Sequence, residues 1–153
     1  MTQLTQNIMS RRLITVPMGT SSIEALKIMK TNRFRHLPIT DELADVVGIV
    51  SMKDLSTIPS ADAVEAFMTS PVEHIKQTEP LQKAVFKMLD KKISCLLVSN
   101  DNEDIVGIVT TDDLLWYLAY LLQDDTEKTR SIFNITNLQT VGDVINSLSE
   151  MGI

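Results

Sequence analysis

Cysteine is almost absent from the 153 residues, because Cys95 is the only one. A single cysteine excludes an internal disulfide and any zinc site built from several cysteines, and it favours a reducing compartment. Glycine and proline number only five each, which excludes a collagen-like or low-complexity chain. With 44% hydrophobic and 22% charged residues, the composition predicts a soluble, cytoplasmic globular protein that needs neither metal nor disulfide to fold.

Long apolar runs are also missing. The first ten residues contain none, so no secretory signal is expected, and the longest run, residues 114–122, is too short to span a bilayer. Lys and Arg number 14 against 20 Asp and Glu, whereas nucleic-acid surfaces need clustered cations. We therefore expect neither nucleic-acid binding nor membrane insertion. Basic residues exceed acidic ones only in residues 1–60, by 7 to 5.

An internal repeat decides the architecture. Residues 48–55 read Gly-Ile-Val-Ser-Met-Lys-Asp-Leu, and residues 107–114 read Gly-Ile-Val-Thr-Thr-Asp-Asp-Leu, an offset of 59. The same offset pairs Met9 with Met68 without any gap. The sequence therefore predicts two copies of one fold, residues 1–60 and 61–123, followed by a tail over 124–153.

Each copy is predicted to run strand, helix, strand, strand, helix. In the first copy, apolar spacing after the N-cap candidates at residues 20–22 predicts a helix to about residue 31. The first copy continues with predicted strands over 35–39 and 46–50 and a helix from Ser51. A helix over 61–68 leads into the second copy. The second copy has a predicted helix over 81–89, strands over 95–98 and 105–109, and a helix from Thr111. The fold class is α/β (α+β), with two small sheets packed face to face about a pseudo-twofold axis and clefts between them.

The tail combines an acidic stretch with a helical pattern. Thr140 is an N-cap candidate, and apolar residues follow at helical spacing: Val141, Val144, Ile145, Leu148 and Met151. This predicts an amphipathic C-terminal helix, which could dock on its own module, exchange across a dimer or bind another protein.

The two copies resemble a tandem pair of CBS domains, also called a Bateman module. The resemblance covers residues 7–123 and rests on the repeat openings 8–10 and 67–69, the strand Leu37-Pro38-Ile39, and two Gly-hydrophobic-hydrophobic-Ser/Thr-x-x-Asp heptads. It implies a regulatory module, not an enzyme. Such a module requires no cofactor and binds AMP, ADP, ATP or S-adenosylmethionine between the repeats as a regulatory ligand, signalling to a partner.

The resemblance assigns the ribose and nearby phosphate to the hydroxyl and carboxylate of each heptad, Ser51 with Asp54 and Thr110 with Asp113. An ionised Asp can accept hydrogen bonds from both ribose hydroxyls. The same Ser/Thr-x-x-Asp spacing also caps helices, with the hydroxyl accepting a backbone N–H. Both interpretations stay open, and they are compatible.

Arg35 and His36 precede the Leu37-Pro38 strand, where some relatives place phosphate-binding side chains. The alternative is a solvated basic rim, because surface charges usually contribute little. In the second copy Ser94 and Cys95 replace Arg35 and His36. The two clefts should therefore differ, with at most one favouring a highly charged phosphate tail.

Four further residues complete the predicted binding set: Thr15, Val16, Pro38 and Ile75. The resemblance places Thr15, Val16 and Ile75 on strands that flank the adenine, although a plain core strand is the preferred explanation for these side chains. Cys95 is predicted to be a core residue. His36 and His74 are too few for a metal or catalytic site, and no catalytic motif is present.

Residues 114–122 are apolar around nearly the whole helix. The resemblance favours a homodimer interface here, and the alternative is a core helix covered by the tail. The leading hypothesis is thus a dimeric sensor of an adenosine-containing ligand. Its rivals are a ligand-free association scaffold and, more weakly, a hydrolase or transferase with an unrecognised site.

Overall fold

The computed structural model describes residues 2–56 and 61–122. These residues form two compact units. Unit 2 comprises the described residues of 14–73, and unit 1 combines those of 1–13 with 74–122. The packing units are therefore offset from the sequence repeats by about a dozen residues at each start.

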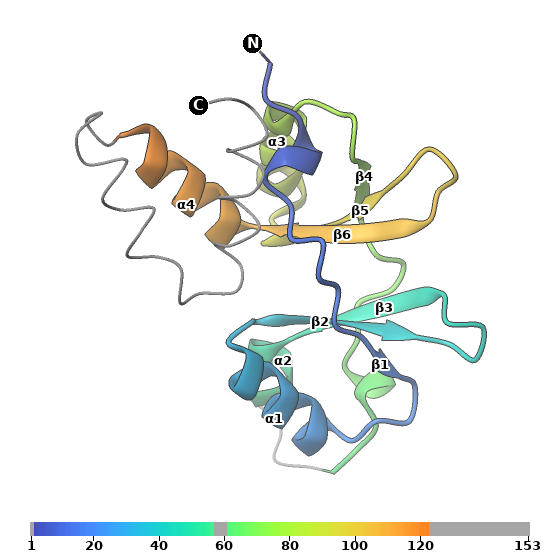
Figure 1. Cartoon of the computed structure of the whole chain (residues 1–153). Helices are drawn as coiled ribbons and strands as arrows, with labels where there is room; N and C mark the ends of the chain where they lie inside the picture. The colour runs from blue at the N-terminus through green and yellow to red at the C-terminus, as the bar shows by residue number, and fades with distance from the viewer. Residues whose placement is uncertain (1, 57–60, 123–153) are drawn as a thin grey trace. The chain divides into compact units, whose positions relative to one another are not determined.

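Unit 2 is a three-stranded mixed sheet with helices against it (Figure 1). Its strands pair in the order β1-β2-β3, with β1 parallel to β2 and β2 antiparallel to β3. The elements are β1 (Val16–Pro17), α1 (Ser22–Asn32), β2 (His36–Thr40), β3 (Val46–Ser51), α2 (Met52–Ser56) and the 3₁₀ turn η2 (Val64–Ala66).

Local signals explain where α1 begins and ends. The Ser21 hydroxyl accepts a hydrogen bond from the Glu24 amide at 3.2 Å, which satisfies one of the first helical N–H groups. The helix ends at Arg33, which adopts a left-handed conformation with φ 58°. Ala25 and Met29, one turn apart, are fully buried and join the helix to the core of unit 2.

Unit 1 repeats this plan, also with a three-stranded sheet, in the order β4-β5-β6. Its elements are η1 (Thr5–Asn7), β4 (His74–Lys76), α3 (Leu81–Lys91), β5 (Cys95–Ser99), β6 (Ile105–Thr110) and α4 (Thr111–Leu121). Helix α3 and strands β5 and β6 stand at the repeat offset from α1, β2 and β3. The predicted α+β class and repeat are therefore confirmed.

The opening segment of each repeat packs in the unit of the other repeat. Ser10 and Ile108 exchange two backbone hydrogen bonds, of 2.8 and 3.0 Å, within unit 1. Thr69 and Ile49 exchange the equivalent bonds, of 2.8 and 3.1 Å, within unit 2. Met9 is accordingly buried in the core of unit 1, beside residues of the second repeat. Neither unit is complete without a segment of the other repeat.

The glycines of the two heptads make room for these segments. A Cβ on Gly107 would lie 2.7 Å from the backbone oxygen of Ser10 and 3.0 Å from the Met9 sulfur. A Cβ on Gly48 would instead clash with the Met68 thioether. Each glycine is thus explained by the close approach of an opening segment.

The helix predicted over residues 61–68 is wrong. Only a single 3₁₀ turn, η2, forms there. Ala63 is bridged to Ser21, and the Val64 amide donates to the Thr20 carbonyl at 2.9 Å. Tertiary backbone pairing therefore replaces the intrahelical bonds of a longer helix.

The predicted C-terminal helix lies outside the described residues. No helix within residues 2–56 and 61–122 is long and apolar enough to cross a membrane.

Candidate functional site

In unit 2, the heptad lies where β3 passes into α2. The Ser51 hydroxyl donates to Asp54 Oδ2 at 2.6 Å, and the Ser51 amide donates to the same oxygen at 3.1 Å. The Asp54 amide donates in return to Ser51 Oγ at 3.2 Å. The hydroxyl and the carboxylate therefore hold each other at the end of the strand.

In unit 1, the equivalent pair makes the same bonds. Asp113 Oδ2 accepts from the Thr110 amide at 2.7 Å and from the Thr110 hydroxyl at 2.8 Å, and the Asp113 amide donates to Thr110 Oγ1 at 3.4 Å. This is a complete capping box for α4. Asp113 is only 4% exposed, whereas Asp54 is exposed.

The capping interpretation is thus confirmed for both heptads. The ligand interpretation is compatible with capping and stays a prediction. The capping bonds of Asp54 and Asp113 use Oδ2. Capping also fixes the side-chain rotamer, so each carboxylate is already oriented before any ligand arrives.

The basic pair lies beside the heptad within unit 2. His36, the first residue of β2, is the cross-strand partner of Ser51, the last residue of β3. The Arg35 carbonyl accepts a hydrogen bond from the amide of Met52, the first residue of α2, at 2.8 Å. One edge of the sheet therefore brings together Arg35, His36, Ser51 and Asp54.

Unit 1 has the same backbone geometry without the basic residues. Cys95 is the cross-strand partner of Thr110, and the Ser94 carbonyl accepts from the Thr111 amide at 3.0 Å. Burial raises the pKa of the Cys95 thiol to about 12, so this side chain is neutral at physiological pH. Cys95 is buried as predicted, and the two sets differ in charge at matched positions.

The remaining predicted residues belong to the sheets. Val16 on β1 and Ile75 on β4 are nearly fully buried in the cores of their units, so the core-strand interpretation holds for both side chains. Pro38 is buried on β2, and Thr15 directly precedes β1. Unit 2 thus holds Thr15, Val16 and Pro38 with the basic pair, while Ile75 lies in the sheet of unit 1.

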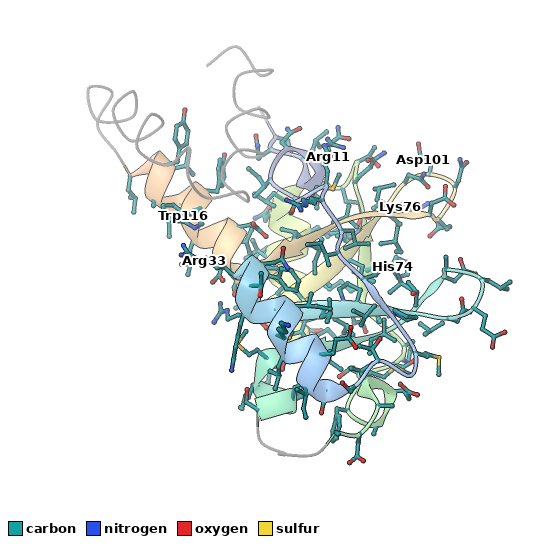
Figure 2. The ribbon with its side chains drawn as sticks, turned by 60° about the horizontal axis from the view of Figure 1, so that its bottom comes forward. Arg11, Arg33, His74, Lys76, Asp101 and Trp116 are labelled. Atoms are coloured by element: carbon teal, nitrogen blue, oxygen red, sulfur yellow. The ribbon has the colours of Figure 1, made fainter. Side chains whose placement is uncertain are left out.

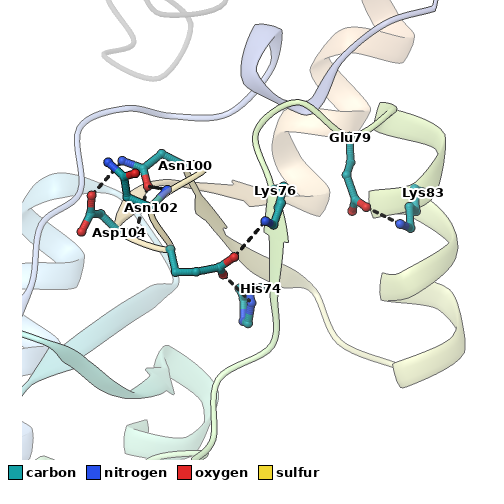
Figure 3. A network of polar contacts seen from close by, with 8 residues as sticks. His74, Lys76, Glu79, Lys83, Asn100, Asn102 and Asp104 are labelled. Carbon is teal, nitrogen blue, oxygen red and sulfur yellow. Dashed lines mark hydrogen bonds and ion pairs between the residues drawn. The ribbon is translucent and has the colours of Figure 1, made fainter.

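A polar network in unit 1 escaped the sequence interpretation (Figure 3). Glu103, in the turn before β6, lies 2.9 Å from Lys76 Nζ and 3.8 Å from His74 Nε2. The hydrogen bond and charge of Glu103 raise the pKa of Lys76, and Lys76 lowers the pKa of Glu103 in turn. The sequence gives no signal for this network, because the repeat places Pro17 and Ala44 at the positions of Lys76 and Glu103.

Figure 2 shows the distribution of side chains over the described residues. Within the same residues, no three His, Cys, Asp or Glu side chains gather as metal ligands would.

The chain belongs to the CBS domain family, whose model matches residues 6–60 and again 64–120.

Two of the similar curated proteins are longer archaeal enzymes. The chain is 33% identical over 110 residues to homoserine O-acetyltransferase of Methanohalobium evestigatum, covering 71% of this chain and 22% of the relative. It is 34% identical over 113 residues to L-aspartate semialdehyde sulfurtransferase of Methanocaldococcus jannaschii, covering 72% and 22%. The chain therefore spans about a fifth of the length of these relatives.

Among solved structures, the CBS domain pair of protein MJ0100 in complex with 5'-methylthioadenosine and S-adenosyl-L-methionine is 31% identical to this chain. The TM-score is 0.72, and the match covers 78% of this chain and 98% of that one. CBSX2 in complex with AMP, at 22% identity, has the same fold with a TM-score of 0.70 over 79% of this chain and 99% of its own.

Proposed function

We propose that this chain is a regulatory module that binds an adenosine-containing ligand and passes its occupancy to a partner. The observation that carries the proposal is the edge of unit 2, where Arg35, His36, Ser51 and Asp54 converge. The similarity to a CBS pair bound to 5'-methylthioadenosine and S-adenosyl-L-methionine supports the ligand class.

Each group at this edge suits one part of such a ligand. The exposed carboxylate of Asp54 can accept hydrogen bonds from vicinal ribose hydroxyls. Arg35 offers a planar guanidinium that matches the oxygens of a phosphate, and His36 adds a second donor. Thr15, the backbone of Val16 and Pro38 supply the neighbouring strands against which an adenine can lie.

The matched set in unit 1 suits a less charged ligand. Thr110 and Asp113 repeat the hydroxyl and carboxylate, but Ser94 and Cys95 supply no cation, and Asp113 is buried. We assign to this set, with Ile75 on β4, an adenosyl group without a phosphate tail. Ligand binding changes the conformation only if the ligand has different affinities for two arrangements of the module.

The module itself has no proposed catalytic activity. The relatives named as an acetyltransferase and a sulfurtransferase are several times longer than the segment they share with this chain. We infer that their activities reside in the parts that this chain does not match. A cytoplasmic location remains a prediction from the single cysteine and the composition.

Isothermal titration calorimetry tests the proposal with AMP, ATP, 5'-methylthioadenosine and S-adenosylmethionine as separate titrants. At least one of these ligands should bind, and the affinity for AMP and ATP should depend on Arg35. Arg35→Ala should weaken AMP by about tenfold or more, in line with the 1.5–3 kcal/mol typical of a charged hydrogen bond.

Lys27→Ala is the matched control, since it removes an exposed basic side chain from α1 that is not part of the predicted binding set. Its AMP affinity should equal that of the wild type. If both variants bind AMP as the wild type does, the phosphate assignment to Arg35 is wrong.

The second candidate function is a ligand-free association scaffold, which the two capping boxes favour because they give both heptads a structural role. The homodimer through residues 114–122 also remains a prediction. A second copy is one possible cover for that helix, and the C-terminal segment of the same chain is another.

A further inference from the structure

Helix α4 carries the last described residues of unit 1. The repeat equivalent of Leu114 is Leu55, which is 1% exposed near the end of α2. Beyond Leu114, helix α4 continues as an extension to Leu121.

This extension is apolar and exposed. Residues 115–122 contain no charged side chain. Five of them are large apolar residues left open to solvent, with exposed fractions of 62% for Leu115, 41% for Trp116, 49% for Leu118, 52% for Leu121 and 76% for Leu122. Figure 2 shows Trp116 on α4. An apolar surface of this extent marks a contact site.

We propose that the C-terminal segment of this same chain, residues 140–151, covers the exposed surface of α4. The chain leaves the described structure at Leu122, which is itself part of this surface, and 31 residues follow in the sequence. Among them, Val141, Val144, Ile145, Leu148 and Met151 repeat at the spacing that puts apolar side chains on one side of a helix. These side chains would form an apolar stripe that can pack against the exposed residues of α4.

Length and tethering both permit the contact. The 17 residues from 123 to 139 can span about 55–60 Å when extended, whereas α4 is only about 16 Å long. The stripe from Val141 to Met151 extends over a similar distance in a helix. A tethered segment also acts at an effective concentration near the millimolar range. A separate partner, including a second copy, has to reach that concentration to compete.

The chemistry of the two surfaces predicts an apolar contact. Because residues 115–122 carry no charge, no ion pair with Asp143 or Glu150 of the segment is expected along this surface. The contact should therefore be insensitive to salt and independent of protein concentration. A dimer interface built on the same residues would depend on protein concentration.

Trp116, the single tryptophan of the 153 residues, reports on this surface. Leu148→Asp places a charge on the apolar stripe, and Asn146→Asp places the same charge on the opposite side of the predicted helix. We expect Leu148→Asp to shift the Trp116 emission to longer wavelength and to increase binding of the dye ANS, while Asn146→Asp changes neither. Both substitutions lie outside the described residues, and far-UV circular dichroism checks that the described parts of units 1 and 2 remain folded.

Light scattering on the wild type and both variants completes the test. An unchanged Trp116 emission in Leu148→Asp overturns the proposal. So does a wild-type dimer whose Trp116 emission shifts on dilution from micromolar to nanomolar protein, because a second copy then covers α4. A concentration-independent shift specific to Leu148→Asp supports the proposal.

Discussion

Units 1 and 2 share a backbone plan and differ in what they expose. Unit 2 presents the basic residues Arg35 and His36 beside an exposed Asp54, on the edge where β3 meets α2. Unit 1 has the neutral Ser94 and Cys95 beside a buried Asp113, and continues into the apolar extension of α4. Unit 2 thus has a polar edge, and unit 1 has an exposed apolar helix.

The exchange of opening segments limits how far the two copies can be separated. A fragment of residues 14–73 retains all of unit 2, including Val64 in its core and the Thr69 pairing with Ile49. A fragment of residues 1–60 follows the sequence repeat but lacks Val64 and Thr69. We expect cooperative urea unfolding from the first fragment only. Cooperative unfolding of 1–60 with equal stability would show that the opening segments are dispensable.

The heptad glycines should differ in their tolerance of a side chain. Gly107→Ala meets the backbone of Ser10, which its two bonds to Ile108 hold in place, so we expect a loss of about 1–3 kcal/mol in unfolding free energy. Gly48→Ala meets the flexible Met68 side chain and should lose less. Urea titrations of the two variants measure the difference, and equal losses would contradict this account.

The capping boxes give a smaller contrast. Thr110→Ala removes the cap of the 11-residue α4 and leaves the buried Asp113 without a hydroxyl donor, so a loss of about 1–2 kcal/mol is expected. Ser51→Ala acts on the five-residue α2 and on the exposed Asp54, and should lose less. Thermal unfolding of both variants measures the two losses of stability. A larger loss for Ser51→Ala would contradict the expectation that the cap of α4 contributes more than that of α2.

The smallest expected effect comes from Glu103, where the first repeat has Ala44. Its lowered pKa means that its stabilising effect is present above the ordinary pKa of a Glu and disappears as pH falls through the lowered value. Glu103→Ala should therefore reduce stability slightly at neutral pH and leave it unchanged in acid. The pKa of Lys76 is raised, so the stabilisation from its contact with Glu103 is lost as the pH rises through that raised pKa. An equal loss at pH 7 and pH 3 would exclude the ion pair as the cause.

The sequence predicts the strands and long helices because their signals are local and occur twice. The cap at Ser21, the Ala25 and Met29 spacing and the repeated heptads are each visible within a few residues. The exchange of opening segments is not, because the bonds of Ser10 to Ile108 join residues that only tertiary pairing brings together. The gapless pairing of Met9 with Met68 was the available signal, but it indicated a repeat without indicating which unit each methionine enters.

The candidate site divides in the same way. The heptads and the basic pair could be read from motifs, and the cross-strand register of His36 with Ser51 then showed that they share one edge. The different burial of Asp54 and Asp113 could not be predicted, because the two motifs share the same spacing and burial depends on tertiary packing.

The most direct test of the central claim is calorimetry of the full chain with AMP and with 5'-methylthioadenosine, repeated on Asp54→Asn and Asp113→Asn. Asn keeps an oxygen that can cap the helix while it removes the charge. We expect wild-type binding, with AMP affinity falling by about 1.5–3 kcal/mol in Asp54→Asn and little changed in Asp113→Asn. No binding of either ligand to the wild type at millimolar concentration would contradict the sensor, and equal AMP losses in both variants would contradict its assignment to unit 2.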